Sequence, residues 1–410
     1  MKYYAKVWIS VLLMAVCAST LDAKQNEDNV IVVINARLID GTGAEPVDGA
    51  VIVIKDGRFQ LVGKNGAVAT PDGATVIDAK GKTVVPGLID AHYHMNYPKD
   101  REEPFILDEA LCSYRAAFHL RRHLMGGITT VLDAGSYHNS GVMAKKAFEE
   151  GLLVGSRPIV VAERINAPGG HGVSRFDMAY EAEGMEGFRE GVRVQVELGA
   201  DVIKILPHYT REELKAGIAE AHRLGRKVAV HSGYRNNMDY IRWAAELDCE
   251  VIMHSYALPD DVIAMMGKKG IYSVPTLEIL LKLHQGARYR KNNVVLHPYE
   301  EIFLKLRKAG VKTAIGTDAI YEYMMENPGH YFDEVERFVK NGCTPMEAIV
   351  AATKIGAEVC DAADRLGTIE KGKLADLLIL DKDPLAEIKN LREVNTIIQE
   401  GKIIKSKLAR

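Results

Sequence analysis

Residues of the types that bind metal ions recur at the ends of short apolar segments of this chain. In the segment LIDAHYH (88–94), the alternation of a β-strand places His92 and His94 on the same face, so both imidazoles can bind one ion. Four more segments contain or end in a residue of this kind, and these are Lys204, His231, His254 and Asp318. A single histidine in an apolar strand is usually an ordinary core residue, but six such residues in five segments indicate a metal site.

Lys204 is the most informative of the six because it lies in the middle of the apolar segment DVIKIL (201–206). A protonated amine buried in such a strand is costly unless its charge is neutralised or used. The position therefore indicates a chemical role for the lysine.

The segments that carry these residues alternate with helical patterns. Each candidate strand is apolar throughout, as a parallel sheet covered on both faces requires. The eight candidates are 88–94, 128–135, 158–164, 201–206, 227–232, 250–255, 270–276 and 311–318. The clearest helix begins at Thr210, which forms a capping-box pattern with Glu213. Eight β/α units predict an α/β protein with a (β/α)8 barrel of the TIM type, whose chemistry collects at the carboxyl ends of the strands.

β-Branched runs separated by glycine and aspartate turns flank this region on both sides, within 29–87 and 375–405. Each piece alone is too short to bury a core, so we expect the two to form one small β-sandwich domain. The predicted division is the β domain over 24–87 and 366–410 and the barrel over 88–365, with a last helix over 345–360.

The first two dozen residues differ from the rest. Two lysines precede the apolar run 7–18, which is too short to span a membrane and is typical of a secretory signal. We therefore expect a signal peptide over 1–23 and an exported protein, periplasmic or extracellular, rather than a buried N-terminal helix. A lipoprotein anchor at Cys17 is less well supported, because the preceding valine is large.

The overall composition is that of a folded protein. The 410 residues are 47% hydrophobic and 26% charged, and the net charge of −3 is not clustered, which argues against a nucleic-acid binder. The five cysteines contain no C-x-x-C pair, so neither a zinc ribbon nor a redox motif is present. One disulfide could form after export, but most cysteines are expected to be small buried hydrophobic residues.

From about residue 29 to its end, the sequence resembles the metal-dependent amidohydrolase superfamily. The similarity lies in PGLIDAHYH, GITTVLDAG, GGHG (169–172), GADVIKI, AHRLGRKVAVH, GTDA (316–319) and the tail TPMEAIVAATKIGAEVC. GADVIKI, GGHG and AHRLGRKVAVH are most similar to the branch of Xaa-Pro dipeptidases and related carboxypeptidases. Imidazolonepropionase-like members share much of the scaffold, but many use one metal ion and lack the bridging lysine.

This resemblance implies a site with two divalent metal ions. The implied ligands are His92, His94 and Asp318 for the first ion, His231 and His254 for the second, and carboxylated Lys204 as a bridge between them. The carbamate makes physical sense because it turns a buried cation into an anion that offsets metal charge. Such ligands favour zinc, with manganese or cobalt as alternatives. A bridging water would be the nucleophile, and Asp318 would act as general base and then as general acid.

Two further residues are candidates for substrate contact. His171 lies in a glycine-rich loop after the third strand and could meet a carboxylate or the polarised carbonyl. Tyr234 follows His231 closely and could donate a hydrogen bond to the developing oxyanion. Roles in ordering the loop and in packing fit these two residues equally well.

The expected function is that of an exported binuclear hydrolase that cleaves an amide bond in dipeptides (Xaa-Pro or another C-terminal residue) or N-acyl amino acids. The alternative is a hydrolase or deaminase of a cyclic amide or nucleobase-like ring. Deamination is less favoured because deaminases of this superfamily carry a catalytic glutamate after the fifth strand, where this chain has the sequence SGYR (232–235) after His231. A non-catalytic binding protein has no need of six filled ligand positions. The expected partners are the small substrate and further copies of the chain, with no nucleic acid and no stable membrane insertion once the signal is removed.

Overall fold

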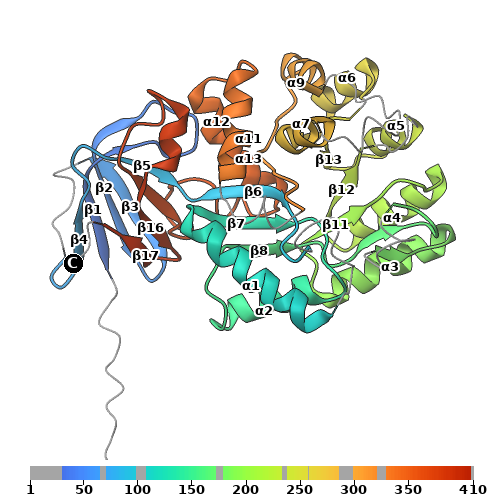
Figure 1. Ribbon diagram of the computed structural model, residues 1–410, viewed down its shortest axis with the longest axis horizontal. Coiled ribbons are helices and arrows are strands. Elements are labelled where there is room, and N and C mark those ends of the chain that lie inside the picture. The colour runs from blue at the N-terminus through green and yellow to red at the C-terminus, as the bar shows by residue number, and fades with distance from the viewer. Residues whose placement is uncertain are drawn as a thin grey trace, which may run out of the picture.

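The structure is a computed structural model, and its elements fall into a sheet at one end and a larger α/β part beside it (Figure 1). It describes residues 30–64, 71–97, 108–171, 179–232, 238–256, 258–285, 299–320 and 329–407. The predicted signal peptide lies outside these residues, as does Tyr234.

The sheet at one end combines strands from both ends of the chain. Its order is β17-β16-β15-β5-β1-β2-β3, with β4 paired to β1. The strands are β1 (Ile31–Leu38), β2 (Val47–Lys55), β3 (Arg58–Lys64), β4 (Thr75–Asp78), β5 (Thr83–Pro86), β15 (Leu377–Leu380), β16 (Val394–Gln399) and β17 (Lys402–Ser406). Leu378 pairs with Val85 across the antiparallel β15–β5 contact, where the blue and red strands of Figure 1 meet. The expectation that both chain ends build one β unit is therefore confirmed.

The larger part contains parallel strands. One sheet has the order β6-β7-β8 and a second has the order β10-β9-β11-β12-β13-β14. These strands are β6 (Leu88–Tyr93), β7 (Ile128–Asp133), β8 (Arg157–Val160), β9 (Arg164–Asn166), β10 (Ala179–Glu181), β11 (Val202–Ile205), β12 (Lys227–His231), β13 (Val251–Met253) and β14 (Tyr272–Val274). Every residue of β6, β7, β8, β11 and β13 is buried, which explains why these strands are apolar throughout.

Helices connect and surround these strands (Figure 1). They are α1 (Glu109–Met125), α2 (Ser140–Glu149), α3 (Gly184–Leu198), α4 (Arg211–Arg223), α5 (Asp239–Glu246), α6 (Asp260–Lys269), α7 (Leu277–Gln285), α9 (Tyr299–Lys308), α11 (Gly329–Lys340), α12 (Pro345–Ala352) and α13 (Lys354–Val359), with the 3-10 helix η1 (Ile388–Arg392). Helix α4 begins with the predicted capping box of Thr210 and Glu213.

The predicted single helix over 345–360 is wrong, because α12 and α13 are separated at Thr353. The backbone of Thr353 has φ −133° and ψ −84°, outside the helical region. Its hydroxyl donates to the carbonyl of Ile349 at 2.7 Å, a side-chain bond of the kind that competes with the helical ladder.

Seven of the eight predicted parallel strands are found among the described residues, but 311–318 does not form a regular strand. It makes one isolated bridge, at Thr313, and the residue after it, Ala319, makes another. The backbone N–H of Thr317 bonds to the carboxylate of Asp90 instead of to a neighbouring strand, and Asp318 has a left-handed φ of 48°. A side-chain acceptor and a left-handed residue therefore interrupt the ladder.

Segment 311–318 nevertheless lies between β14 and β6. Ala314 donates its backbone N–H to the Ser273 carbonyl at 2.9 Å. Ala91 donates to the Ile315 carbonyl at 2.8 Å. The segment thus links the six-stranded sheet to the three-stranded sheet.

A buried ion pair holds the N- and C-terminal sheet against the parallel strands. Arg157, at the start of β8, lies 2.5 Å from Asp376 and 3.0 Å from Glu400. Gln399 also donates to the backbone carbonyls of Thr129 and Gly155. Because these contacts lie at the amino ends of β7 and β8, they leave the carboxyl ends of the strands clear.

Two further expectations concern cysteines and membranes. Cys112, Cys249, Cys343 and Cys360 are free thiols and buried, as expected of small hydrophobic residues. Within the described part of the chain, every helix is too short or too polar to cross a bilayer.

Candidate active site

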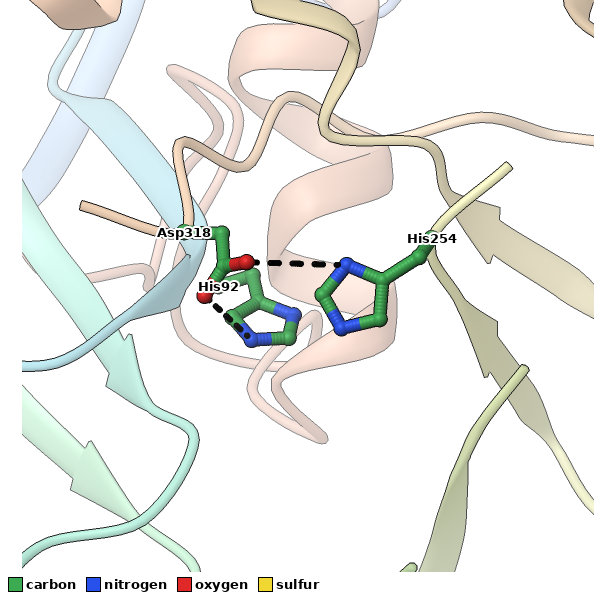
Figure 2. A group of neighbouring side chains, drawn as sticks. All are labelled: His92, His254 and Asp318. Carbon is green, nitrogen blue, oxygen red and sulfur yellow. Dashed lines mark ion pairs between the residues drawn. The ribbon is translucent and has the colours of Figure 1, made fainter. Parts of the chain in front are cut away.

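Three of the six predicted metal ligands meet at the carboxyl end of β6. Asp318 Oδ1 lies 3.4 Å from His92 Nε2 and 3.2 Å from His94 Nε2. Asp318 Oδ2 lies 3.8 Å from His254 Nδ1, and the dashed lines of Figure 2 join the carboxylate of Asp318 to both His92 and His254. One ligand atom from each of these last three residues lies within 4.8 Å of the others, close enough to surround a single ion.

The other two predicted ligands adjoin this group. The ring centroids of His231 and His254 are 4.4 Å apart, and those of His92 and His254 are 4.6 Å apart. Lys204 is 2% exposed and its Nζ contacts the sulfur of Met253 on β13. The structure therefore brings all six residues into one buried cluster.

Two of these residues occupy backbone conformations that disfavour ordinary side chains. His254 has φ 73° and Asp318 has φ 48°, and both follow the last residues of a strand or strand-like segment. Each is held by a short backbone hydrogen bond of 2.7 Å, from His254 to Val274 and from Asp318 to His92. Strained left-handed residues of this kind cluster at functional sites, where they direct side chains that a regular strand would not.

Contacts to one ring nitrogen fix the orientation of the His94 and His254 imidazoles. His94 Nδ1 lies 2.9 Å from the carbonyl oxygen of Gly135, and His254 Nδ1 lies 2.9 Å from Thr276 Oγ1. The contact with Gly135 leaves Nε2 of His94 facing Asp318, whereas Nδ1 of His254 lies near both Thr276 and Asp318. His92 Nδ1 is buried and has no hydrogen-bond partner among the described residues, an arrangement that costs free energy unless another ligand satisfies it.

Asp90 connects the two segments that carry His92 and Asp318. Its side chain is fully buried, and Oδ1 accepts from the backbone N–H of His92 at 3.2 Å and of Thr317 at 3.0 Å. Its Oδ2 accepts from the hydroxyl of Thr317 at 2.7 Å. The carboxylate is thus a clamp between β6 and 311–318.

Burial keeps three of the four imidazoles uncharged, those of His92, His231 and His254. Desolvation lowers the pKa of His92 and His231 well below the usual value and that of His254 to about 3. It also lowers the pKa of Lys204 to about 7, so that a large share of the amine is neutral at neutral pH. Neutral imidazoles and a neutral amine have free lone pairs, which metal binding and carboxylation require.

Asp318 supplies the negative charge of the cluster. Burial acts to raise its pKa, but the hydrogen bond from His94 and the charges of His254 and Lys204 outweigh burial and lower it. Its side chain is 14% exposed and therefore reaches the open side of the site. Four imidazoles, one carboxylate and one amine form a donor set that fits divalent ions of the zinc type.

Of the two predicted substrate contacts, the structure places one. The His171 ring lies 5.1 Å from the His231 ring, and its backbone carbonyl accepts from Asn166 Nδ2 at 2.9 Å. Gly170 permits this approach, because a Cβ there would lie 2.3 Å from the Asn166 amide. Tyr234 falls outside the described residues, so its predicted role stays a prediction.

Sequence reasoning missed two polar residues beside the cluster. Arg164, at the start of β9, is 5% exposed and its Nη1 donates to Tyr97 Oη at 3.0 Å. The Tyr97 ring in turn lies 4.6 Å from the His94 ring. An arginine at the end of the apolar segment 158–164 was the signal that could have found this pair.

Comparisons with known proteins agree with this arrangement. The pattern of the Amidohydrolase family matches residues 83–404. Ochratoxinase from Aspergillus niger is 28% identical over 93% of this chain and 88% of its own length. Imidazolonepropionase from Stenotrophomonas maltophilia is 27% identical over 86% of this chain and 91% of its own length. A crystal structure of a Xaa-Pro dipeptidase with bound methionine superposes with a TM-score of 0.82 at 27% identity, covering 92% of this chain and 100% of that one. These matches imply a TIM-barrel-type fold with a β-sandwich domain.

The buried neutral imidazoles predict how the stability of the metal-free protein depends on pH. The pKa of His254 is about 3 in the folded state and about 6.5 in an unfolded chain, so only the unfolded chain takes up a proton between these values. Stability should therefore be lost as the pH falls below about 6.5. The slope to measure is the change of the free energy of unfolding with pH, determined by urea unfolding of chelator-treated protein. His254→Gln should reduce this slope by about 1.4 kcal/mol per pH unit. An unchanged slope would contradict the burial of a neutral His254.

Proposed function

Because this chain belongs to the amidohydrolase family and is thus a hydrolase of amide C–N bonds, we propose that it cleaves dipeptides or N-acyl amino acids at a binuclear metal site. The observation that carries this proposal is the convergence of four histidines, a buried lysine and an aspartate in one cluster. Such a cluster has no purpose in packing alone, because every member is a polar group removed from water.

We further infer that the parallel strands close into an eight-stranded barrel. The backbone bonds of 311–318 to Ser273 on one side and to Ala91 on the other support this closure. In such a barrel the six residues all lie at the carboxyl ends of the strands, where barrel enzymes carry out their chemistry.

The proposed division of ligands follows the cluster. His92, His94 and Asp318 would hold one ion, His231 and His254 the other, and Lys204 would bridge them as a carbamate. Such ions, when bound, make a water molecule nucleophilic near neutral pH and polarise the scissile carbonyl. Zinc is the metal that the imidazole-rich set favours, with manganese or cobalt as alternatives.

Lys204 is suited to carboxylation. With a pKa of about 7, a substantial share of its amine is neutral near pH 7 and can attack carbon dioxide, forming an N–C bond and releasing one proton. The resulting carbamate is an anion, which removes the cost of an unpaired ammonium group in a site 2% exposed.

Asp318 would carry the proton. Its lowered pKa keeps it ionised at neutral pH, and its partial exposure lets it reach both the water and the substrate. It would accept a proton from the attacking water and pass it to the leaving nitrogen, acting as base and then as acid. His171 would contact the scissile carbonyl or a substrate carboxylate, and Tyr234 would donate to the oxyanion.

The finer substrate assignment rests on relatives. The Xaa-Pro dipeptidase and ochratoxinase matches, over most of the chain, favour an amide in a dipeptide (Xaa-Pro or another C-terminal residue) or in an N-acyl amino acid. The imidazolonepropionase match, over 86% of the chain, favours a cyclic amide as the second candidate. Residues 1–23 support export to the periplasm or the extracellular space, and we expect a homo-oligomer.

The proposal is tested by loading the protein with zinc, counting ions by elemental analysis, and assaying a dipeptide library against a cyclic-amide panel. We expect about two ions per chain and hydrolysis within the dipeptide or N-acyl amino acid set. Fully active protein with one ion or fewer would contradict the binuclear site. Activity confined to cyclic amides would favour the second candidate.

Lys204→Ala should lose most of its metal and activity, because the bridging anion is removed. Short carboxylic acids in excess should restore part of both, since they can replace the carbamate. Lys204→Arg serves as the control and should not be rescued, because it adds a permanent positive charge. Elemental analysis and activity on the same samples test this, and a fully active Lys204→Ala enzyme would exclude the bridging role.

Asp318→Asn separates the role of Asp318 in metal binding from its role in proton transfer. The four histidines and Lys204 should retain much of the metal, but an amide cannot accept a proton. We expect kcat to fall at least about a hundredfold, with a smaller change in KM. Steady-state kinetics and a metal count on one preparation decide the matter, and near-normal kcat with intact metal would remove Asp318 from proton transfer.

A further inference from the structure

The hydroxyl of Thr276 is placed unusually for a threonine that precedes a helix. Thr276 comes immediately before α7, which begins at Leu277, and its backbone carbonyl accepts from the N–H of Leu280. A threonine at this position ordinarily uses its side-chain oxygen to accept a backbone N–H of the first turn. Among the residues that the structure describes, no N–H of α7 donates to this hydroxyl, which instead lies 2.9 Å from His254 Nδ1.

Two other helices show the ordinary arrangement. The hydroxyl of Thr210 accepts from the N–H of Glu213 at 3.2 Å at the start of α4. The hydroxyl of Thr344 accepts from the N–H of Glu347 at 3.2 Å at the start of α12. In both cases the glutamate side chain also accepts from the backbone of the threonine, so each helix caps itself. Helix α7 has to satisfy its first N–H groups in another way.

A glutamate from a neighbouring helix takes over this role at α7. Glu334 on α11 accepts from the backbone N–H of Leu277 at 2.8 Å and of Glu278 at 2.6 Å, with one bond to each oxygen. Arg337, one turn further along α11, pairs with the side chain of Glu278 at 3.0 Å. Glu334 is 0% exposed, and burial raises its pKa to about 8. Keeping an acid there costs free energy that an apolar residue would not cost.

The turn between β14 and α7 is also joined to the segment that carries His254. The backbone N–H of His254 donates to the Val274 carbonyl at 2.7 Å. The N–H of Ser255 donates to the Pro275 carbonyl at 3.1 Å. Thr276 itself is fully buried and has a left-handed φ of 50°. The turn is thus held by α11 on one side and by the His254 segment on the other, with the Thr276 hydroxyl between them.

We propose that Glu334 is a positioning residue of the active site: because it caps α7 from outside, the hydroxyl of Thr276 is left to hold the His254 imidazole. Partners of this kind fix the orientation of a metal-binding histidine and the nitrogen that carries its proton. This inference rests on the proposed function, since His254 is one of its metal ligands. Glu334 acts through Thr276, so the effects of changing the two residues should not add.

The test is a double-mutant cycle of E334M and T276V, with zinc affinity measured by competition against a chelating dye. Each substitution should weaken the binding of one zinc ion by at least about tenfold, the usual effect of removing the partner of a metal-binding histidine. The double variant should bind zinc no more weakly than T276V, because that substitution already removes the hydroxyl through which Glu334 acts. E334Q keeps one acceptor oxygen and T276S keeps the hydroxyl, so both should retain more of the affinity.

E347M is the matched control, because it removes the capping glutamate of α12. It should lower the thermal stability and leave the zinc affinity unchanged. Wild-type zinc affinity in E334M, or losses that add in the double variant, would overturn the inference. If E334M does not fold, E334Q takes its place in the cycle and the same two outcomes decide.

A measurement on the chelator-treated protein separates this inference from the proposed function. NMR of protein with isotope-labelled histidine reports the surroundings of His254 Nδ1 without metal or substrate, and the signal is identified by its absence in His254→Gln. E334M and T276V should both shift this signal, whereas E347M should not. An unchanged signal in E334M would overturn the inference whatever the protein hydrolyses, and failure to hydrolyse the proposed substrates would count only against the proposed function.

Discussion

The fully buried carboxylate of Asp90 is the contact on which the geometry of the site depends. It accepts the backbone N–H groups of His92 and Thr317 and the hydroxyl of Thr317, and so joins β6 to 311–318. These two segments carry three of the six clustered residues, yet a regular ladder does not join them. A side-chain carboxylate can accept bonds from several directions, so it tolerates the left-handed turn that brings Asp318 over the histidines.

A second constraint is electrostatic, because the site gathers many basic groups in a space with little water. Desolvation resolves this by keeping His92, His231 and His254 neutral and by lowering the pKa of Lys204, while Asp318 stays ionised. Carboxylation of Lys204 would remove the repulsion between its ammonium group and the guanidinium of Arg164.

Much of this site is predictable from sequence, since His92 and His94 alternate on one strand and Lys204 stands out in an apolar run. The pattern of short, continuously apolar runs also locates β6, β7, β8 and β11 to β14 correctly. It fails for 311–318, because hydrogen bonding to the Asp90 side chain leaves no mark on hydrophobic periodicity. Arg164 was overlooked for a related reason: it is the first residue of the short strand β9, and its proximity to Tyr97 and Gly135 arises only from tertiary packing.

The pairing of β5 with β15 also has a consequence for how the chain acquires its structure. Val85 meets Leu378, so one edge of β5 stays unpaired until nearly the whole chain has been synthesised. A contact between such distant positions is slow to form, and an open apolar edge is prone to pair with other chains. The first five strands therefore depend on the last three for protection. The sheet that the first strands begin is thus complete only when the last residues of the chain have joined it.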